Sequence, residues 1–285
     1  MTNIIALGTF DGLHAAHRAV LQGANAALLF NEHPQKLLSG QAPLQLMCNE
    51  ERAARLQKAG IAPLHIPFEE IATLPPEAFF HEILRRRFGA TGLRCGHNFR
   101  FGANASGDIH LLRSLCNAHG MQLSVVPKVV YQGAAVSSSR IRAALQVGDI
   151  TQANAMLGRT FGYSFEVVHG QRLGHVLGTP TLNQCFPPDF CVPRFGVYAS
   201  RAFVDGKWRP SMTNIGLRPT IKENSEAAGQ HRRCRSETHI LDFDGDLYGK
   251  YVPVRLLSYI RDERKFDNLE ALKGQIRQDL REIIL

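Results

Sequence analysis

The chain has 285 residues, 44% of them hydrophobic and 20% charged, which is typical of a globular protein with room for two ordinary domains. No apolar run reaches the ~20 residues of a membrane-spanning helix, and the chain enters a strand-like run at once rather than a secretory signal, so we expect a cytoplasmic protein. The net charge of +8 is spread over both halves without a basic tail or stripe, which suits small anionic substrates such as nucleotides and gives little support to nucleic-acid binding.

The first motif follows a short apolar run. Residues 4–7 predict a buried strand, Gly8 ends it, and residues 17–22 predict the first turns of a helix. A strand, a glycine turn and a helix start gather backbone N–H groups and the positive end of a helix dipole, which favours anions. His14 and His17 are three residues apart, so they would share one helix face and reach a bound phosphate. Two histidines at this spacing also occur by chance on protein surfaces, or as part of a metal site.

Short apolar runs then alternate with helical patterns. Strands are predicted over 26–30, 64–66 and 92–95, and helices over 50–58, capped by Asn49, and from Pro76 to about Phe88. This alternation predicts an α/β domain with a parallel, doubly wound sheet. Sheets of this kind bind ligands at the carboxyl ends of their strands.

Two further loops are candidates for that position. Residues 96–102 follow a predicted strand, and residues 136–142 open a predicted helix. The hydroxyl groups of Ser138 and Ser139 and the free N–H groups of a helix start bind phosphate oxygens, and Arg142, one turn further, adds a forked charge-assisted contact. A serine run before a helix is also typical of a simple helix cap.

The pattern changes after a short helix predicted over 149–159. Strand-like runs are found at residues 164–168, 196–204, 211–215, 237–243 and 252–260. Short strands separated by turns predict an antiparallel barrel, and a terminal amphipathic helix is predicted from Leu269, capped by Asn268. We therefore place the domain boundary at residue 158, which gives domains 1–158 and 159–285.

A glycine-rich run precedes the second group of strands. Gly170, Gly174 and Gly178 are evenly spaced and would let the backbone approach a triphosphate. Without a bound phosphate, three glycines at this spacing are simply turn residues. No Walker-type G-x-x-x-x-G-K-[ST] sequence occurs in the chain, which excludes an ordinary P-loop kinase.

Together these motifs resemble those of the bacterial bifunctional riboflavin kinase/FAD synthetases. Residues 8–17 resemble G-x-F-D-G-V-H-x-G-H, residues 96–102 resemble G-x-[DN]-F-x-F-G, residues 136–142 resemble I-S-S-T-x-x-R, and residues 170–183 resemble G-x-x-x-G-x-x-L-G-x-P-T-x-N. The resemblance covers nearly the whole chain. It implies a Rossmann-like nucleotidylyltransferase domain followed by a six-stranded riboflavin kinase β-barrel with a terminal helix. The implied reactions are phosphorylation of riboflavin to FMN and adenylylation of FMN to FAD, both with ATP and Mg²⁺.

The resemblance assigns adenylylation to the first domain. It implies that His14, His17 and Arg142 stabilise charge while the FMN phosphate attacks the α-phosphorus of ATP, with no protein nucleophile. The nucleotide-binding residues implied there are Gly8, Phe10, Asn98, Ser138 and Ser139.

Phosphorylation is assigned to the second domain in the same way. Glu237 is the implied general base that takes the proton of the riboflavin 5′-hydroxyl, and Arg261 is implied to contact the flavin. The implied ligands of ATP are Gly170, Gly174, Thr181 and Asn183, the last two also of Mg²⁺.

Two alternatives stay open. Ala16 stands where the family has glycine, and its methyl group could crowd an adenosine close to the backbone; the first alternative is thus a riboflavin kinase with a weakened or inactive adenylyltransferase. The second is a nucleotide- or RNA-binding regulator without catalysis, against which the retained reactive side chains argue. We expect riboflavin, FMN and ATP as partners, no nucleic acid and no membrane, in a monomer or weak homo-oligomer.

Overall fold

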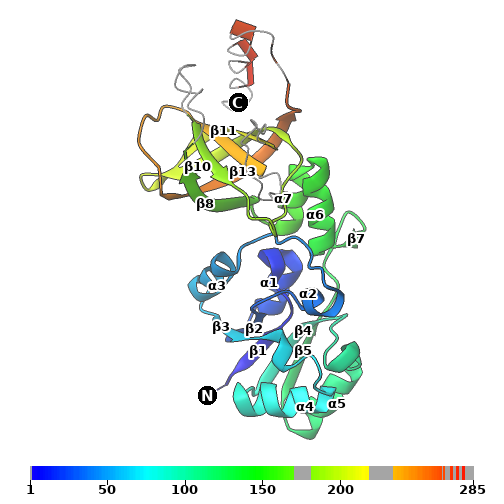
Figure 1. Cartoon of the computed structure of the whole chain (residues 1–285). Helices are drawn as coiled ribbons and strands as arrows, with labels where there is room; N and C mark the ends of the chain where they lie inside the picture. The colour runs from blue at the N-terminus through cyan, green and yellow to red at the C-terminus, as the bar shows by residue number, and fades with distance from the viewer. Residues whose placement is uncertain are drawn as a thin grey trace, which may run out of the picture. The chain divides into compact units, whose positions relative to one another are not determined.

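The computed structural model describes residues 2–169, 181–217 and 234–264, together with residues 266, 270, 271, 274, 275, 278 and 279. The chain packs as two compact units, residues 1–138 and 139–285, whose elements are labelled in Figure 1. The domain boundary at residue 158 stays a prediction.

The first unit contains a five-stranded sheet in which every neighbouring pair is parallel. In sheet order its strands are β3 (Ala62–Ile66), β2 (Ala26–Phe30), β1 (Ile4–Leu7), β4 (Gly92–Gly96) and β5 (Gln122–Val126). The chain moves outward from β1 to β3 and then crosses back to β4 on the other side of β1. This reversal of direction creates a crevice beyond the carboxyl ends of β1 and β4.

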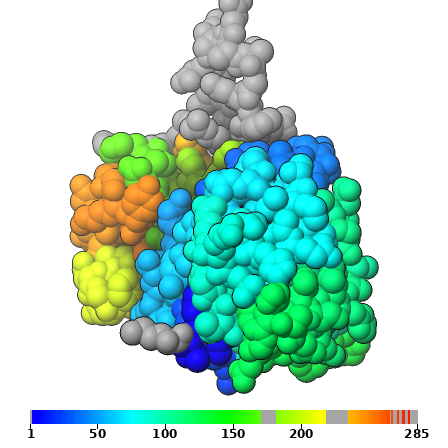
Figure 2. All heavy atoms as spheres, turned by 90° about the horizontal axis from the view of Figure 1, so that it is seen from below, coloured from blue at the N-terminus to red at the C-terminus, as the bar shows by residue number. Residues whose placement is uncertain are grey.

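Both faces of this sheet are covered, as a doubly wound fold requires. Alternate residues of β1 enter two separate cores, Ile5 and Leu7 on one face and Ala6 on the other. The helical segments are η1 (Asp11–Leu13), α1 (Ala15–Leu21), α2 (Pro34–Ser39), α3 (Asn49–Lys58), η2 (Phe68–Glu70), α4 (Pro76–Ala78), η3 (Phe79–Arg87), η4 (Ala103–Ala105) and α5 (Ile109–Ala118). In the space-filling view, the cyan and green atoms of α4, η3 and α5 form one face of the unit (Figure 2). A two-stranded hairpin, β6 (Val130–Tyr131) and β7 (Ala134–Ala135), completes it.

The second unit is built around a closed six-stranded antiparallel barrel, as predicted. Around the barrel its strands are β10 (Gly196–Val204), β11 (Lys207–Leu217), β12 (Cys234–Ile240), β9 (Thr181–Cys185), β8 (Gly162–Val168) and β13 (Tyr251–Arg261). Its interior holds packed aromatic rings such as Tyr163 and Phe165, 5.2 Å apart. Buried hydroxyl groups continue across the barrel, because Thr213 lies 2.8 Å from both Ser200 and Thr238.

Two helices join the barrel in this unit. They are α6 (Ser138–Val147), whose residues after Ser138 belong to the second unit, and α7 (Ile150–Leu157). Arg194, in the segment before β10, ties α6 to the barrel: its N–H donates to the Leu145 carbonyl at 2.9 Å, and its guanidinium contacts Asp262 at 3.0 Å. The α6 helix is therefore bonded to the barrel at its carboxyl end.

Several local expectations needed correction. Asn49 is the first residue of α3 rather than its cap, which is Cys48, because the Asn49 side chain instead donates to the Asn31 carbonyl. Strand β12 ends at Ile240, before the predicted residue 243, because Asp242 has a left-handed φ of 52°. Strand β9 lies in a stretch whose sequence indicates only a phosphate-binding motif. The described residues of the predicted terminal segment (270, 271, 274, 275, 278 and 279) are helical, and none of the described helices has the length and apolar character needed to cross a bilayer.

We predict that Gly162→Ala destabilises the barrel. A Cβ atom at residue 162 would lie 2.2 Å from the backbone oxygen of Val254 on the neighbouring strand β13, and backbone cannot move aside as a flexible side chain can. The expected cost is roughly 1–3 kcal/mol, measured as a lower thermal midpoint. Ser164→Ala on the same strand is the control, and equal midpoints for both variants would contradict the prediction.

Candidate active sites

A cavity of about 1050 Å³ opens in the first unit at the crevice beyond β1 and β4. It begins at Gly8 and Gly96, where these two strands end, and its lining extends to Ser137 and Ser138. Of the predicted nucleotide residues, Gly8, Phe10, His14, His17, Asn98 and Ser138 all line it. The structure thus brings residues from three distant loops to one cavity, of a size that accommodates a small-molecule ligand.

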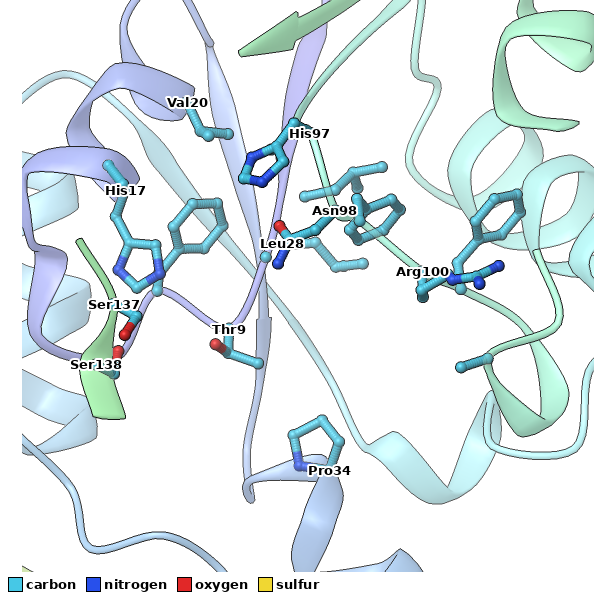
Figure 3. Close-up of a pocket in the computed structure, with 18 of the residues that line it drawn as sticks. Thr9, His17, Val20, Leu28, Pro34, His97, Asn98, Arg100, Ser137 and Ser138 are labelled. Atoms are coloured by element: carbon cyan, nitrogen blue, oxygen red, sulfur yellow. The ribbon is translucent and has the colours of Figure 1, made fainter. Parts of the chain in front are cut away.

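The charged side chains among the described residues that line this cavity are all of one sign. Arg100 and Lys128 contribute cations, and three histidines line the cavity as well, whereas no aspartate or glutamate is among the described residues that line it. Figure 3 shows His17, Ser137 and Ser138 on one side and Arg100 on the other, with Asn98 between them. Such a lining favours an anionic ligand with more than one charged group.

The two histidines are held by the start of α1. His14 is its N-cap, and the Nδ1 atom of His14 accepts from the backbone N–H of His17 at 3.3 Å. The rings stack with centroids 3.6 Å apart, and the Phe10 ring meets His17 edge-on. Phe10 has a left-handed φ of 53° and is fully buried, and a strained residue of this kind is held in place only by its surroundings. The predicted sharing of one face by the two imidazoles is confirmed.

Burial lowers the pKa of His17 well below its ordinary value of 6.5, and the neighbouring His14 and Arg52 act in the same direction. The Nδ1 atom of His17 is buried and has no hydrogen-bond partner among the described residues. A neutral imidazole with an unused nitrogen is therefore present at the helix start, ready to pair with a ligand.

The third loop is tied directly to the first turn. Ser138 Oγ donates to the Asp11 carbonyl at 3.0 Å, which joins segments 127 residues apart in the sequence. Ser139 and Arg142 follow on α6, within the second unit, and their roles stay predictions.

The second candidate site lies on the outer face of the barrel. In the strand register, Asn183 of β9 is directly opposite Glu237 of β12, and Thr181 is opposite His239. Leu182 and Thr238, the pair between them, are buried. Since side chains alternate along a strand and opposed residues share a face, Thr181, Asn183 and Glu237 project to the same side.

The Glu237 carboxyl is partly removed from water by the strands around it, although its side chain is exposed at one side. This desolvation raises the pKa of Glu237; the Arg235 guanidinium lowers it, and the Glu263 carboxylate raises it. A carboxylate with a raised pKa holds a proton more readily, as a general base must.

A small cavity of about 280 Å³ adjoins this face. Thr181 lines it together with Thr238, Leu247 and Tyr248, whereas Asn183 and Glu237 do not. Gly170 and Gly174 lie outside the described residues.

Arg261 has a clear structural role. Its guanidinium forms a forked ion pair with the buried Asp279 carboxylate, with Nη2 to Oδ2 at 2.7 Å and Nε to both oxygens at 3.1 Å. It thereby joins the end of β13 to the terminal helical segment. The predicted flavin contact of Arg261 stays a prediction.

One residue of the first site was missed by the sequence analysis. Arg52 of α3 is 8% exposed, and it donates to the carbonyls of Thr9 at 3.0 Å and Phe30 at 3.2 Å. It therefore fixes the loop that begins the first motif. The sequence does contain one indication of this burial. Arg52 is four residues before Leu56, so both lie on the same, buried face of the helix.

Comparisons with known proteins match both parts of the chain. The family model described as FAD synthetase matches residues 1–140, and that described as riboflavin kinase matches residues 157–284. Both halves of the chain therefore match a known family.

Individual relatives match over nearly the whole length. The bifunctional riboflavin kinase/FMN adenylyltransferase of Escherichia coli (strain K12) is 33% identical, covering 97% of this chain and 90% of its own. Those of Pseudomonas fluorescens and Bacillus subtilis are 31% and 30% identical, covering 97% and 99% of this chain and 90% and 92% of their own. A solved structure described as a macrolide-efflux protein from Streptococcus pneumoniae is 27% identical with a TM-score of 0.83, covering 98% of this chain and 93% of that one.

We predict that His17 makes the first unit sensitive to acid. Because its pKa in the folded state is lowered, the unfolded state binds this proton first, and the free energy of unfolding decreases as the pH falls below about 6.5. In His17→Gln, the thermal midpoint should therefore decrease less between about pH 7 and about pH 5. The exposed His65→Gln provides the control, and parallel pH profiles for wild type and His17→Gln would contradict the assignment.

Proposed function

The chain belongs to the family of bifunctional riboflavin kinase/FMN adenylyltransferases, and we propose which of its residues perform each step. The family function is phosphorylation of riboflavin to FMN and adenylylation of FMN to FAD, with ATP and Mg²⁺. Both family models match, so the alternative of a kinase with an inactive adenylyltransferase is not favoured. A cytoplasmic location, and a monomer or weak homo-oligomer that binds no nucleic acid, are also proposals.

For adenylylation, the cavity in the first unit is the proposed site. The observation that supports it is the gathering of His14, His17 and Ser138 in a cavity whose described lining carries cations and no carboxylate. An oxygen of the FMN phosphate attacks the α-phosphorus of ATP, and pyrophosphate leaves. His14, His17 and Arg142 stabilise the charge that develops on the transferring oxygens, while Gly8, Phe10, Asn98, Ser138 and Ser139 position the nucleotide.

For phosphorylation, the outer face of β9 and β12 is the proposed site. The observation that supports it is the register that sets Asn183 opposite Glu237. The riboflavin 5′-hydroxyl oxygen attacks the γ-phosphorus of ATP, its proton passes to the Glu237 carboxylate, and ADP leaves.

The donor groups on this face fit magnesium. The Thr181 hydroxyl and the Asn183 amide oxygen are hard oxygen donors, two residues apart on the same face of β9. Magnesium bound there would neutralise part of the phosphate charge. Gly170 and Gly174 are proposed to approach the same phosphates, and Arg261 to act near the flavin.

Glu237→Gln separates the two steps. The variant should lose the kinase activity by roughly 10²–10⁴-fold, because the amide cannot accept the hydroxyl proton. FMN and ATP should still give FAD at the wild-type rate, because that reaction is assigned to other residues. Glu166→Gln, an exposed glutamate on β8 of the same barrel, is the control. Equal riboflavin turnover in wild type and Glu237→Gln would remove Glu237 as the base.

Ala16→Gly tests the remaining alternative. Ala16 lines the large cavity, and one methyl group occupies little of its volume, so the variant should form FAD from FMN and ATP within a few-fold of the wild-type rate. The measurement is FAD and pyrophosphate formed over time. If the wild-type chain gives neither product and Ala16→Gly restores both, the alternative with an inactive adenylyltransferase is correct.

A further inference from the structure

Asn214 on β11 carries a hydrogen bond that fixes the orientation of its amide. Its Nδ2 atom donates to Oε1 of Glu263 at 3.0 Å. An ionised carboxylate can only accept hydrogen bonds, so the nitrogen rather than the oxygen of the Asn214 amide must face Glu263. The amide oxygen consequently points away from Glu263.

That oxygen is buried and unsatisfied. Asn214 Oδ1 has no hydrogen-bond partner among the described residues, and a buried acceptor left unpaired costs free energy unless something binds it. Such an atom beside a candidate active site is a reason to look for a ligand group that donates.

The strand register places Asn214 beside the proposed catalytic base. Asn214 of β11 is directly opposite Glu237 of β12, which is itself opposite Asn183 of β9. These three polar side chains therefore form one row on the outer face of the barrel, with Cβ atoms of neighbours about 4.5–5.5 Å apart.

The chemistry of a hydroxyl group decides what Asn214 can accept. The reacting 5′-hydroxyl of riboflavin has a single proton, which passes to Glu237 in the proposed mechanism, so it cannot also donate to Asn214. A neighbouring hydroxyl of the same ribityl chain can. We propose that Asn214, oriented by Glu263, accepts a hydrogen bond from a non-reacting ribityl hydroxyl and thereby selects and positions the acceptor substrate of the kinase. This inference rests on the proposed function of Glu237.

Glu263 has room at this position because residue 216 is glycine. A Cβ atom on Gly216 would lie 2.3 Å from Oε1 of Glu263, so the carboxylate lies across the glycine while it holds Asn214.

The decisive experiment compares riboflavin with analogues that lack each non-reacting ribityl hydroxyl in turn. Wild-type enzyme should bind one of these deoxy analogues roughly tenfold more weakly than riboflavin, since it leaves Asn214 Oδ1 unpaired. Asn214→Leu has no acceptor, so it should bind that analogue and riboflavin equally. Affinities are measured by quenching of flavin fluorescence in the presence of Mg²⁺ and ADP, and Asn214→Ala serves if the leucine variant does not fold.

Two results would overturn the proposal. In the first, the wild type does not distinguish riboflavin from any deoxy analogue. In the second, Asn214→Leu keeps the wild-type discrimination against all of them; if its Mg²⁺ requirement also rises, Oδ1 is assigned to a water molecule on the metal.

Glu263 is tested by two variants. Glu263→Leu removes the acceptor of the Asn214 amide, so it should lose part of the discrimination. Glu263→Gln keeps an acceptor at this position, so it should keep the discrimination. Discrimination unaffected by Glu263→Leu would remove its orienting role.

The binding readout also keeps this inference separate from the assignment of the base. If Glu237→Gln retains full kinase activity while Asn214→Leu loses discrimination, the base is wrong and the hydroxyl contact stands. If Glu237→Gln is inactive and discrimination does not depend on Asn214, the assignment of Glu237 as the base stands and the hydroxyl contact of Asn214 is wrong.

Discussion

The alignment of three antiparallel strands is the constraint on which the second site depends. Hydrogen bonds of β11, β12 and β9 bring Asn214, Glu237 and Asn183 into one row. A shift of any of these strands by one residue would turn its polar group into the barrel and its buried neighbour, such as Thr213 or Leu182, outward. The hydroxyl groups of Ser200, Thr213 and Thr238 pair inside the barrel in this same register. One alignment therefore sets both the packing of the interior and the row of polar side chains outside.

The first site depends on a different kind of constraint. Parallel strands end at one edge of a sheet, and the reversal of direction at β1 leaves a crevice there. The turn after β1 is then held by contacts that come from elsewhere in the chain: Arg52 binds the Thr9 carbonyl, and Ser138 binds that of Asp11. Strained backbone at Phe10 is maintained by these contacts rather than by local preference.

The sequence was sufficient for the architecture because both periodicities are clear. Alternation of apolar runs with helical patterns predicted the parallel sheet, and short strands separated by turns predicted the barrel. The sequence was insufficient where contacts between residues far apart in the chain determine the position of a side chain. Nothing local indicates that Asn49 binds the Asn31 carbonyl instead of capping its helix, that Arg52 is buried, or that Asn214 meets Glu263, 49 residues further along the chain. The strand at Thr181–Cys185 was not predicted because Thr181, Asn183 and Gln184 are polar, so the run shows no clear alternation of apolar and polar residues.

The attachment of α6 has a consequence for any attempt to take the enzyme apart. Its first residue is bonded to the opening turn of the sheet domain, whereas its last carbonyls accept from Arg194 near the barrel. Expression of either half alone must therefore sever one of these attachments. A cut before the helix removes the hydrogen bond of Ser138 from the large cavity, and a cut after it leaves the Leu145 and Val147 carbonyls without the donors that Arg194 supplies. A truncation series through residues 138–147 would therefore trade one set of native hydrogen bonds against the other, because both sets end on the same helix.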